Sequence, residues 1–188
     1  SDHEPYETYR QFYDASRQER TVLIGKLVDT AADIMDSIWH PRFLQEPNAK
    51  VVCTRAFVHE ILKRTKTTYS TLQISLFYLL RVKKQVHERL LRRKQKQKQQ
   101  QNQQPVSERL DDLICCGRRM FLASLMVASK YLHDKNYRNT AWSKISGLSV
   151  AEVNASELAF LRLIDYKLFI SKPTFDKWYA TLHSFIQK

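Results

Sequence analysis

Histidine and cysteine, the side chains that most often carry chemistry in proteins, are few in this sequence and show no site-forming spacing. The histidines are His3, His40, His59, His87, His133 and His183. They form no H-E-x-x-H pattern and have no other spacing typical of zinc ligands. Cys53, Cys115 and Cys116 are an odd number without a C-x-x-C pair. The sequence therefore predicts no metal site and no cofactor. The thiols are interpreted as small apolar residues of a reduced, intracellular protein, in the nucleus, the cytoplasm or both.

Motifs of catalysis built on glycine or serine are also missing from the sequence. Gly25, Gly117 and Gly147 stand far apart, so no glycine-rich loop could hold phosphate groups. No G-x-S-x-G motif occurs, and the acidic residues form no evident general acid/base pair. Cys115 and Cys116 lie next to leucine and isoleucine, which favours packed or half-exposed thiols over a nucleophile. The sequence predicts a protein that is not an enzyme and has no catalytic residue.

Lys130 and Glu157 are the charged residues that stand out, because each lies among apolar neighbours on a predicted central helix. Lysine is seldom buried without a partner, so Lys130 needs either solvent or a counter-charge. Two interpretations stay open from periodicity alone. Both side chains could reach solvent at the edges of their helices, or they could form a polar spot on an apolar surface that binds a partner.

The segment that carries Lys130, residues 118–132, is apolar nearly all round. A helix of this kind belongs in the middle of a domain. Its small residues, among them Ala123, Ser124 and Ala128, predict places where neighbouring helices come close. Only 3 Gly and 5 Pro occur among the 188 residues, and this composition favours one all-α domain.

Capping and proline signals predict where the first helices begin and end. After an N-terminal arm of residues 1–18, an amphipathic helix is predicted over about residues 19–39 and a second over about 49–63. The run from Ser70 to Gln73 has the pattern of a capping box, which would open a third helix. Ser107 is predicted to restart a helix that continues through residue 132.

The same signals predict three more helices near the C-terminus. A short turn of helix over residues 142–145 would end at Gly147, and Ser149 opens a second capping box and a helix through Tyr166. Pro173 suits the first turn of a last helix that ends near residue 187. The core positions predicted for the helix after Ser149 are Val153, Leu158, Phe160, Leu161 and Ile164.

The net charge of +12 is concentrated in one stretch, because residues 81–98 hold nine Lys or Arg and one acid. This stretch runs into Lys94–Gln104, which lacks apolar residues and is expected to be disordered. We interpret residues 89–107 as a basic, Gln-rich surface insertion, either solvated or in contact with acidic substrates or partners. Charge confined to one loop does not favour nucleic acid as a partner. The apolar runs are too short for a membrane span, and no signal peptide is expected.

Several of these segments together resemble a cyclin box. They are Thr54-Arg55-Ala56-Phe57, Ser70 to Leu80, Phe121 to Leu132, Asn136 to Trp142 and Asn154 to Leu168. The resemblance spans about residues 51–168 and is closest to the fungal Pcl-type cyclins, which have a single box. It implies a five-helix box, over about residues 49–168, with one additional helix at each end (about 19–39 and 173–187).

The resemblance also implies a function and a set of site residues. Single-box cyclins of this type bind a cyclin-dependent kinase of the phosphate- and nutrient-sensing kind, activate it and help to select its protein substrates. Lys130 and Glu157 fall where cyclins engage main-chain groups near the regulatory helix of the kinase. The positions that pack apolar surface against the kinase are Val127, Tyr131, Leu161, Tyr166 and Leu168.

A substrate-docking groove is the weaker implication of the resemblance. Cyclins that dock substrates carry a Met-Arg-Ala-Ile-Leu motif and a tryptophan further along. Here Thr54-Arg55-Ala56-Phe57-Val58 and Ile61 stand at those positions. The candidate docking residues are Arg55, Phe57, Ile61 and Arg118.

Two alternatives come from other functional classes. General transcription factors use cyclin folds to bind DNA, but they carry two boxes and this chain has room for one. A helical scaffold without a kinase partner is the other alternative. Identification of a co-purifying kinase would separate the three.

Overall fold

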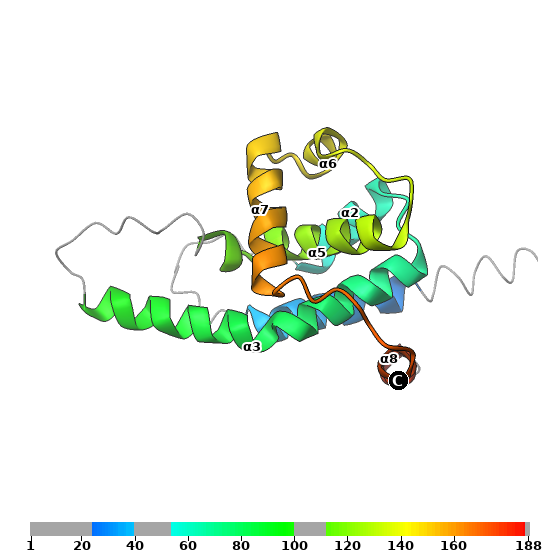
Figure 1. Ribbon diagram of the computed structural model, residues 1–188, viewed down its shortest axis with the longest axis horizontal. Helices are drawn as coiled ribbons and strands as arrows, with labels where there is room; N and C mark the ends of the chain where they lie inside the picture. Colours follow the sequence, from blue (N-terminus) through cyan, green and yellow to red (C-terminus); the bar gives the residue numbers. More distant parts are fainter. Residues whose placement is uncertain (1–23, 40–53, 100–111, 187–188) are drawn as a thin grey trace, which may run out of the picture.

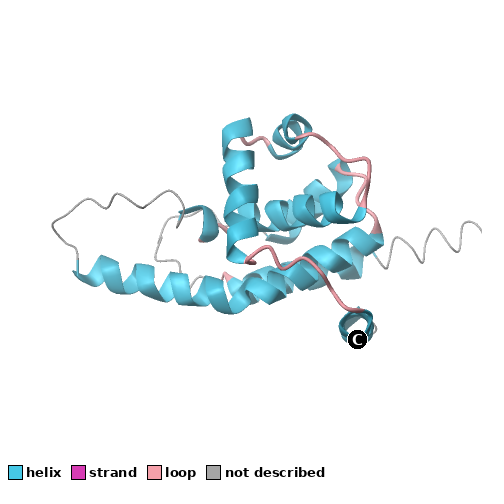
Figure 2. Ribbon diagram, in the orientation of Figure 1, coloured by secondary structure: helices cyan, strands magenta, loops and turns pink. Residues whose placement is uncertain are grey.

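The computed structural model describes residues 24–39, 54–99 and 112–186, and within these ranges the chain forms helices and loops without any β-strand (Figure 2). The prediction of an all-α fold is therefore confirmed. The described helices are residues 24–38, α2 (Thr54–Arg64), α3 (Tyr69–Gln99), a short turn at 112–114, α5 (Gly117–Leu132), α6 (Asn139–Ser146), α7 (Val150–Leu163) and α8 (Lys172–Ile186). The predicted arm of residues 1–18 and residues 100–107 of the predicted insertion lie outside the described ranges.

Helix α5 lies at the centre of the domain, between α3 and α7 (Figure 1). Every side chain from Met120 to Ala128 is buried. Ala123 and Ser124 keep the helix thin enough for its neighbours to approach, and the Ser124 hydroxyl donates to the carbonyl oxygen of Phe121 at 2.7 Å. This bond satisfies a polar group that burial would otherwise leave unpaired. The sequence prediction of a central helix over residues 118–132 is confirmed.

The predicted continuous helix from Ser107 through residue 132 is wrong, because the chain breaks at Cys115 and Cys116. Cys116 has an extended backbone (φ −96°, ψ 105°), and α5 begins one residue later. Trp39 explains the break. Its indole N–H donates to the carbonyl oxygen of Ile114 at 2.9 Å, and its ring lies so close to Gly117 that an added Cβ would be 3.1 Å from Trp39 Cδ2.

Helix α3 begins at Tyr69, and the residue that caps it is Thr68 rather than the predicted Ser70. The Thr68 hydroxyl accepts a hydrogen bond from the backbone N–H of Thr71 at 3.2 Å. Starting the helix here also places the Thr71 hydroxyl 2.8 Å from Nε2 of His133, at the end of α5. The two residues of this contact between helices lie far apart in the sequence, so a local capping pattern could not reveal it.

The expectation that Lys94–Gln104 is disordered is wrong for its described part, because α3 continues as helix to Gln99. Lysine and glutamine are good helix formers, and extending an existing helix adds one hydrogen bond for each residue that is fixed. Arg93 also forms an ion pair with Asp112 at 2.8 Å. Figure 1 shows this end of α3 extending past α7. Leu90 is the last buried side chain in the described part of α3.

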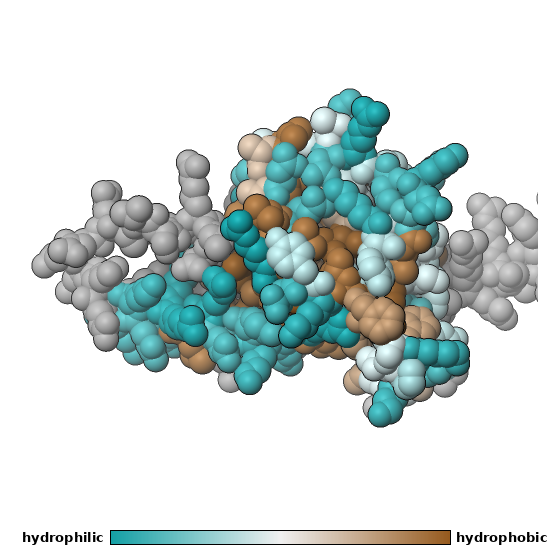
Figure 3. Space-filling model, in the orientation of Figure 1, coloured by the Kyte–Doolittle hydropathy of each residue, from teal (hydrophilic) through white to brown (hydrophobic). Residues whose placement is uncertain are grey.

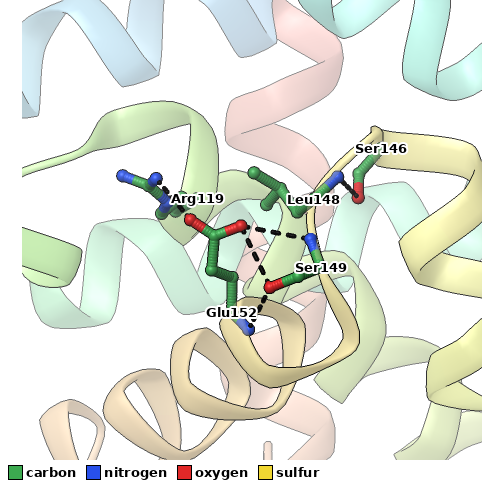
Figure 4. Close-up of polar contacts among 5 residues, drawn as sticks. All are labelled: Arg119, Ser146, Leu148, Ser149 and Glu152. Atoms are coloured by element: carbon green, nitrogen blue, oxygen red, sulfur yellow. Dashed lines mark hydrogen bonds and ion pairs between the residues drawn. The ribbon is translucent and has the colours of Figure 1, made fainter.

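The predicted capping box at the start of α7 is confirmed (Figure 4). The Ser149 hydroxyl accepts from the Glu152 backbone N–H at 3.1 Å, and the Ser149 backbone N–H donates to Glu152 Oε2 at 3.1 Å. Arg119 on α5 reaches the other carboxylate oxygen of Glu152 at 3.2 Å. The backbone hydrogen bond from Ser149 is the main cause that lowers the pKa of Glu152 below its ordinary value. One carboxylate thus caps α7 and joins it to α5.

Helix α6 confirms the predicted short turn, although it starts three residues earlier. It ends at Gly147, whose left-handed backbone (φ 76°) suits glycine. Helix α7 in turn ends at Leu163, three residues before the predicted end. Asp165 and Tyr166 both adopt left-handed backbone conformations (φ 56° and 54°), which no α-helix accommodates.

Helix α8 packs on the opposite side of α3 from α7 (Figure 1). The Trp178 indole N–H donates to the carbonyl oxygen of Gln73 at 2.9 Å, and its ring contacts that of Phe77 with centroids 5.8 Å apart. Trp178, Leu182 and Ile186 are its buried residues. This amphipathic spacing was predicted from the sequence.

Candidate functional site

Lys130 on α5 and Glu157 on α7 form an ion pair, with Lys130 Nζ 2.6 Å from Glu157 Oε2. The side chains are 37% and 17% exposed, respectively. The pair therefore combines the two interpretations that the sequence left open, since the charges pair with each other and also border solvent. It lies at the surface where the last turn of α5 meets α7.

Two asparagines complete the polar cluster, and the sequence analysis did not select either. Asn139, the first residue of α6, accepts from Lys130 Nζ through Oδ1 at 2.7 Å. Its amide nitrogen donates to Asn154 Oδ1 at 2.6 Å and to Glu157 Oε1 at 3.4 Å. Asn154 precedes Glu157 by three residues and so shares its face of α7. The spacing of three residues from Glu157 could have identified Asn154 from the sequence. Asn139 could not be identified in this way, because its contacts depend on the tertiary fold.

The paired charges keep hydrogen-bonding capacity that nothing in the described part of the chain uses. Lys130 has three N–H donors, two of which are directed to Glu157 and Asn139. The Glu157 carboxylate has about four acceptor positions, and the hydrogen bonds that it accepts here come from Lys130 and Asn139. A partner could therefore receive a hydrogen bond from the ammonium group and donate one to the carboxylate. Peptide backbone offers both kinds of group.

Large apolar side chains are exposed beside this polar cluster, since Tyr131 and Leu132 follow Lys130 and Leu158 follows Glu157. The others that are exposed on α7 and the segment after it are Val150, Tyr166 and Phe169. The prediction of Leu158 as a core residue is wrong. Its helix is apolar on several sides, so periodicity did not identify the outward face. Figure 3 shows the apolar side chains gathered in the middle of the face where α5 and α7 lie.

The other residues implied as kinase contacts differ in how much surface they offer. Val127 was expected to pack against the kinase, but it is only 3% exposed and belongs to the core, so its side chain adds little to the exposed surface. Leu161 and Leu168 are half-buried and pack against the core. Tyr131 and Tyr166 are exposed. Burial is the main cause that raises the pKa of Tyr78 on α3, and the charge interaction with Tyr131 adds to the rise.

Of the four candidate substrate-docking residues, Phe57 and Arg118 contact each other, Arg55 is exposed and Ile61 is buried. Arg118 lies over the ring of Phe57, 5.9 Å from its centroid, and Phe57 contacts Phe121 edge-on. Arg55 forms an ion pair with Asp29 at 2.6 Å. Ile61 is in the core, so it cannot line an exposed groove in this conformation. The docking role stays a prediction.

Within the described ranges, no three His, Cys, Asp or Glu side chains are grouped as metal ligands. No helix in those ranges is both long enough and apolar enough to cross a bilayer. Of the predicted thiols, Cys115 is buried and Cys116 half-buried, and Cys53 lies outside the described residues.

Comparison with known proteins identifies the family. Residues 48–168 match the family model described as Cyclin. This chain belongs to the cyclin family. The match covers α2, α3, α5, α6 and α7, which include every residue of the polar cluster. The resemblance to cyclins stated from the sequence is thereby confirmed.

The relatives of this cyclin include fungal and plant proteins. It is 31% identical over 136 residues to the G1/S-specific cyclin pas1 of Schizosaccharomyces pombe, which covers 71% of this chain and 28% of pas1. It is 29% identical over 122 residues to PHO85 cyclin-5 of Saccharomyces cerevisiae, covering 65% of this chain and 46% of that one. Cyclin-U2-2 of Arabidopsis thaliana is 38% identical over 60 residues, 32% of this chain and 26% of its own.

These relatives are longer than the region that matches. The cyclin spans less than half the length of each of the three. The similarity to pas1 and the PHO85 cyclins agrees with the predicted closeness to the fungal Pcl type. No solved structure matches this chain significantly.

Proposed function

We propose that this cyclin is a non-catalytic regulatory subunit that binds and activates a cyclin-dependent Ser/Thr protein kinase. The proposal extends to a kinase of the fungal phosphate- and nutrient-sensing type and to help in selecting its substrates. Three of the relatives are named PHO85 cyclins and one a G1/S-specific cyclin. As part of the proposal, the protein acts inside the cell, in the nucleus, the cytoplasm or both.

The observation that carries the proposal is the Lys130–Glu157 pair with its exposed apolar rim. A tight interface usually consists of a few apolar anchors around charges that become desolvated on binding. The free donor on Lys130 and the free acceptor positions on Glu157 suit the main-chain groups of a partner segment. The pair is also held by Asn139, whose amide nitrogen is in turn bound by Asn154, so little side-chain freedom is lost on binding.

Activation would follow from differential binding rather than from chemistry by this chain. A partner that binds one conformation of a kinase more tightly shifts the population toward it. An active kinase needs its catalytic lysine paired with a glutamate of a mobile helix. A cyclin that engages only the conformation in which this pair is formed therefore raises activity without a catalytic group of its own.

Reconstitution with purified kinases tests the proposal. The chain alone should show no ATP-dependent phosphorylation, and adding it to a monomeric cyclin-dependent kinase should raise kinase activity. Phosphorylation by the chain alone contradicts its non-catalytic role. Failure to bind any cyclin-dependent kinase of a fungal panel overturns the proposal, and DNA binding in the same preparation would favour the transcription-factor alternative.

A further inference from the structure

The segment between α7 and α8, residues 165–171, is held to α3 by side chains rather than by secondary structure. The Tyr78 hydroxyl donates to the carbonyl oxygen of Leu168 at 2.8 Å. Arg81 Nη1 donates to the carbonyl oxygens of Lys167 at 2.7 Å and Phe169 at 3.1 Å. Three consecutive carbonyls therefore receive hydrogen bonds from two residues one turn apart on one helix.

The guanidinium group of Arg81 is itself fixed in place. It lies 4.7 Å from the centroid of the Phe77 ring, within the range of a cation–π interaction. Phe77 in turn contacts Trp178 of α8. Because the planar group is held on one side by an aromatic ring, its donors point at the segment without a large loss of side-chain freedom.

The segment carries two aromatic side chains that are exposed over most of their surface. Phe169 is 73% exposed and Tyr166 is 58% exposed. Tyr166 also has φ 54°, a left-handed conformation that is unfavourable for a bulky residue because its Cβ comes too close to the following carbonyl oxygen. A strained backbone that presents an exposed aromatic residue is typical of a binding site rather than of a packing solution.

We infer that Arg81 and Tyr78 are positioning residues that hold the segment 165–171 against α3 so that Tyr166 and Phe169 serve as apolar anchors for the kinase. This inference rests on the proposed function, and it adds Phe169, Arg81 and Tyr78 to the binding surface. Aromatic anchors with few rotatable bonds supply much contact area at low entropic cost. Fixing their backbone before binding lowers that cost further.

Helix α3 connects this segment to the helix that carries Lys130. Tyr78 is fully buried in α3, which packs along α5, and its hydroxyl donates to the carbonyl oxygen of Leu168. Burial raises the pKa of Tyr78 above its ordinary value, so its hydroxyl stays protonated and keeps donating across the neutral range.

The test measures affinity for a cyclin-dependent kinase that binds the wild-type chain, together with thermal melting. Phe169→Ala should weaken binding about tenfold or more and leave the melting temperature unchanged, because the ring buries little in the free chain. Arg81→Ala and the milder Tyr78→Phe should each weaken binding several-fold. The backbone N–H of Lys167 donates to the carbonyl oxygen of Ile164 at 3.2 Å, and that of Leu168 donates to the carbonyl oxygen of Tyr166 at 3.0 Å. Hydrogen exchange of both groups should become faster in Arg81→Ala.

A double-mutant comparison separates positioning from a merely structural role. If Arg81 acts through the anchors, Arg81→Ala should cause no further loss of affinity in a Tyr166→Ala/Phe169→Ala background. Lys84→Ala and Leu91→Ala serve as matched controls, because they change exposed α3 residues outside the turn that holds the segment. Both variants should bind like wild type. The inference is overturned, while the proposed function stands, if the affinity losses from Arg81→Ala and from the double variant add in full. It is also overturned if the Arg81 and Phe169 variants bind as tightly as wild type. A wild-type chain that binds no kinase overturns the proposed function itself.

Discussion

The ammonium group of Lys130 and a carboxylate oxygen of Glu157 lie 2.6 Å apart, although 27 residues separate them in the sequence. The pair links α5 to α7 at the border of an exposed apolar surface. An exposed ion pair contributes little to folding, about 0–1 kcal/mol. Its position beside Tyr131 and Leu158 makes recognition of a partner the better explanation for its presence.

Removing either member of the pair should therefore affect binding more than folding. Lys130→Ala or Glu157→Ala is expected to weaken kinase binding by about 2–5 kcal/mol, because one charge would be left desolvated and unpaired in the complex. Calorimetry with the kinase measures the loss, and circular dichroism checks the fold. Lys172→Ala, which removes an exposed lysine that pairs with Asp176 on α8, is the control and should bind normally. A sharp drop in melting temperature with normal binding by the folded fraction would show that the pair is structural.

Asn139 should matter for both stability and binding, since it joins three helices. Asn139→Ala removes hydrogen bonds to Lys130, Asn154 and Glu157 and should cost about 1–2 kcal/mol of unfolding free energy. Denaturant titration measures this change. The control is Asn136→Ala, whose amide contacts the backbone of His133 within the same loop. Equal effects of the two substitutions would mean that the contacts between helices contribute nothing measurable.

Much of the fold could be predicted because its signals are local. The central position of α5 follows from an unbroken apolar run with small residues, and the cap of α7 follows from Ser149 and Glu152 three residues apart. Lys130 and Glu157 were selected because charges among apolar neighbours are unusual. The family resemblance rests on the same contiguous segments.

What the sequence could not predict depends on contacts between distant residues or on choices between nearly equal signals. The break before α5 is imposed by Trp39, which is 75 residues from the carbonyl that it bonds. Leu158 was expected in the core and is exposed, whereas Val127 was expected at the surface and is buried. Both helices are apolar on more than one side, so periodicity did not identify the outward face. The polar end of α3 has nothing to bury, so composition predicted disorder, yet helix propensity and propagation from a packed helix favour order up to Gln99.

Gly117 and Gly25 form a matched pair for testing the contact with Trp39. A Cβ at Gly117 would lie 3.1 Å from the Trp39 ring, so Gly117→Ala should destabilise the fold by about 1–3 kcal/mol. Nothing lies within 4 Å of a Cβ at Gly25. Gly25→Ala, in a helix, should be neutral or stabilise by up to about 1 kcal/mol. Denaturant midpoints of the two variants decide this, and equal midpoints would show that the indole moves aside at little cost.

The cap at Glu152 predicts a pH dependence of stability. Its folded pKa lies below the ordinary value of 4.5, so the carboxylate stabilises the folded state above that pH. This contribution is lost as the pH falls from about 4.5 through the lower folded pKa, where the carboxylate becomes protonated and no longer accepts from Ser149. Glu152→Gln should therefore show a flatter fall in stability across this acid range than wild type, measured by melting temperature. Parallel curves for the two proteins would mean that the hydrogen bonds do not favour the charged form.

The basic end of α3 should serve association with acidic protein substrates rather than folding. Lys94, Lys96 and Lys98 follow Leu90, the last buried side chain in the described part of the helix, so replacing all three with Gln should leave the melting temperature within a few degrees. A kinase complex with this variant should phosphorylate an acidic substrate more slowly at low salt, because a cluster of positive charge raises the rate of encounter. The difference should fade as salt shortens the range of the field to about 8 Å near 0.15 M. A neutral substrate is the control, and an equal loss on both substrates at every salt concentration would show that these lysines act on kinase binding and not on steering.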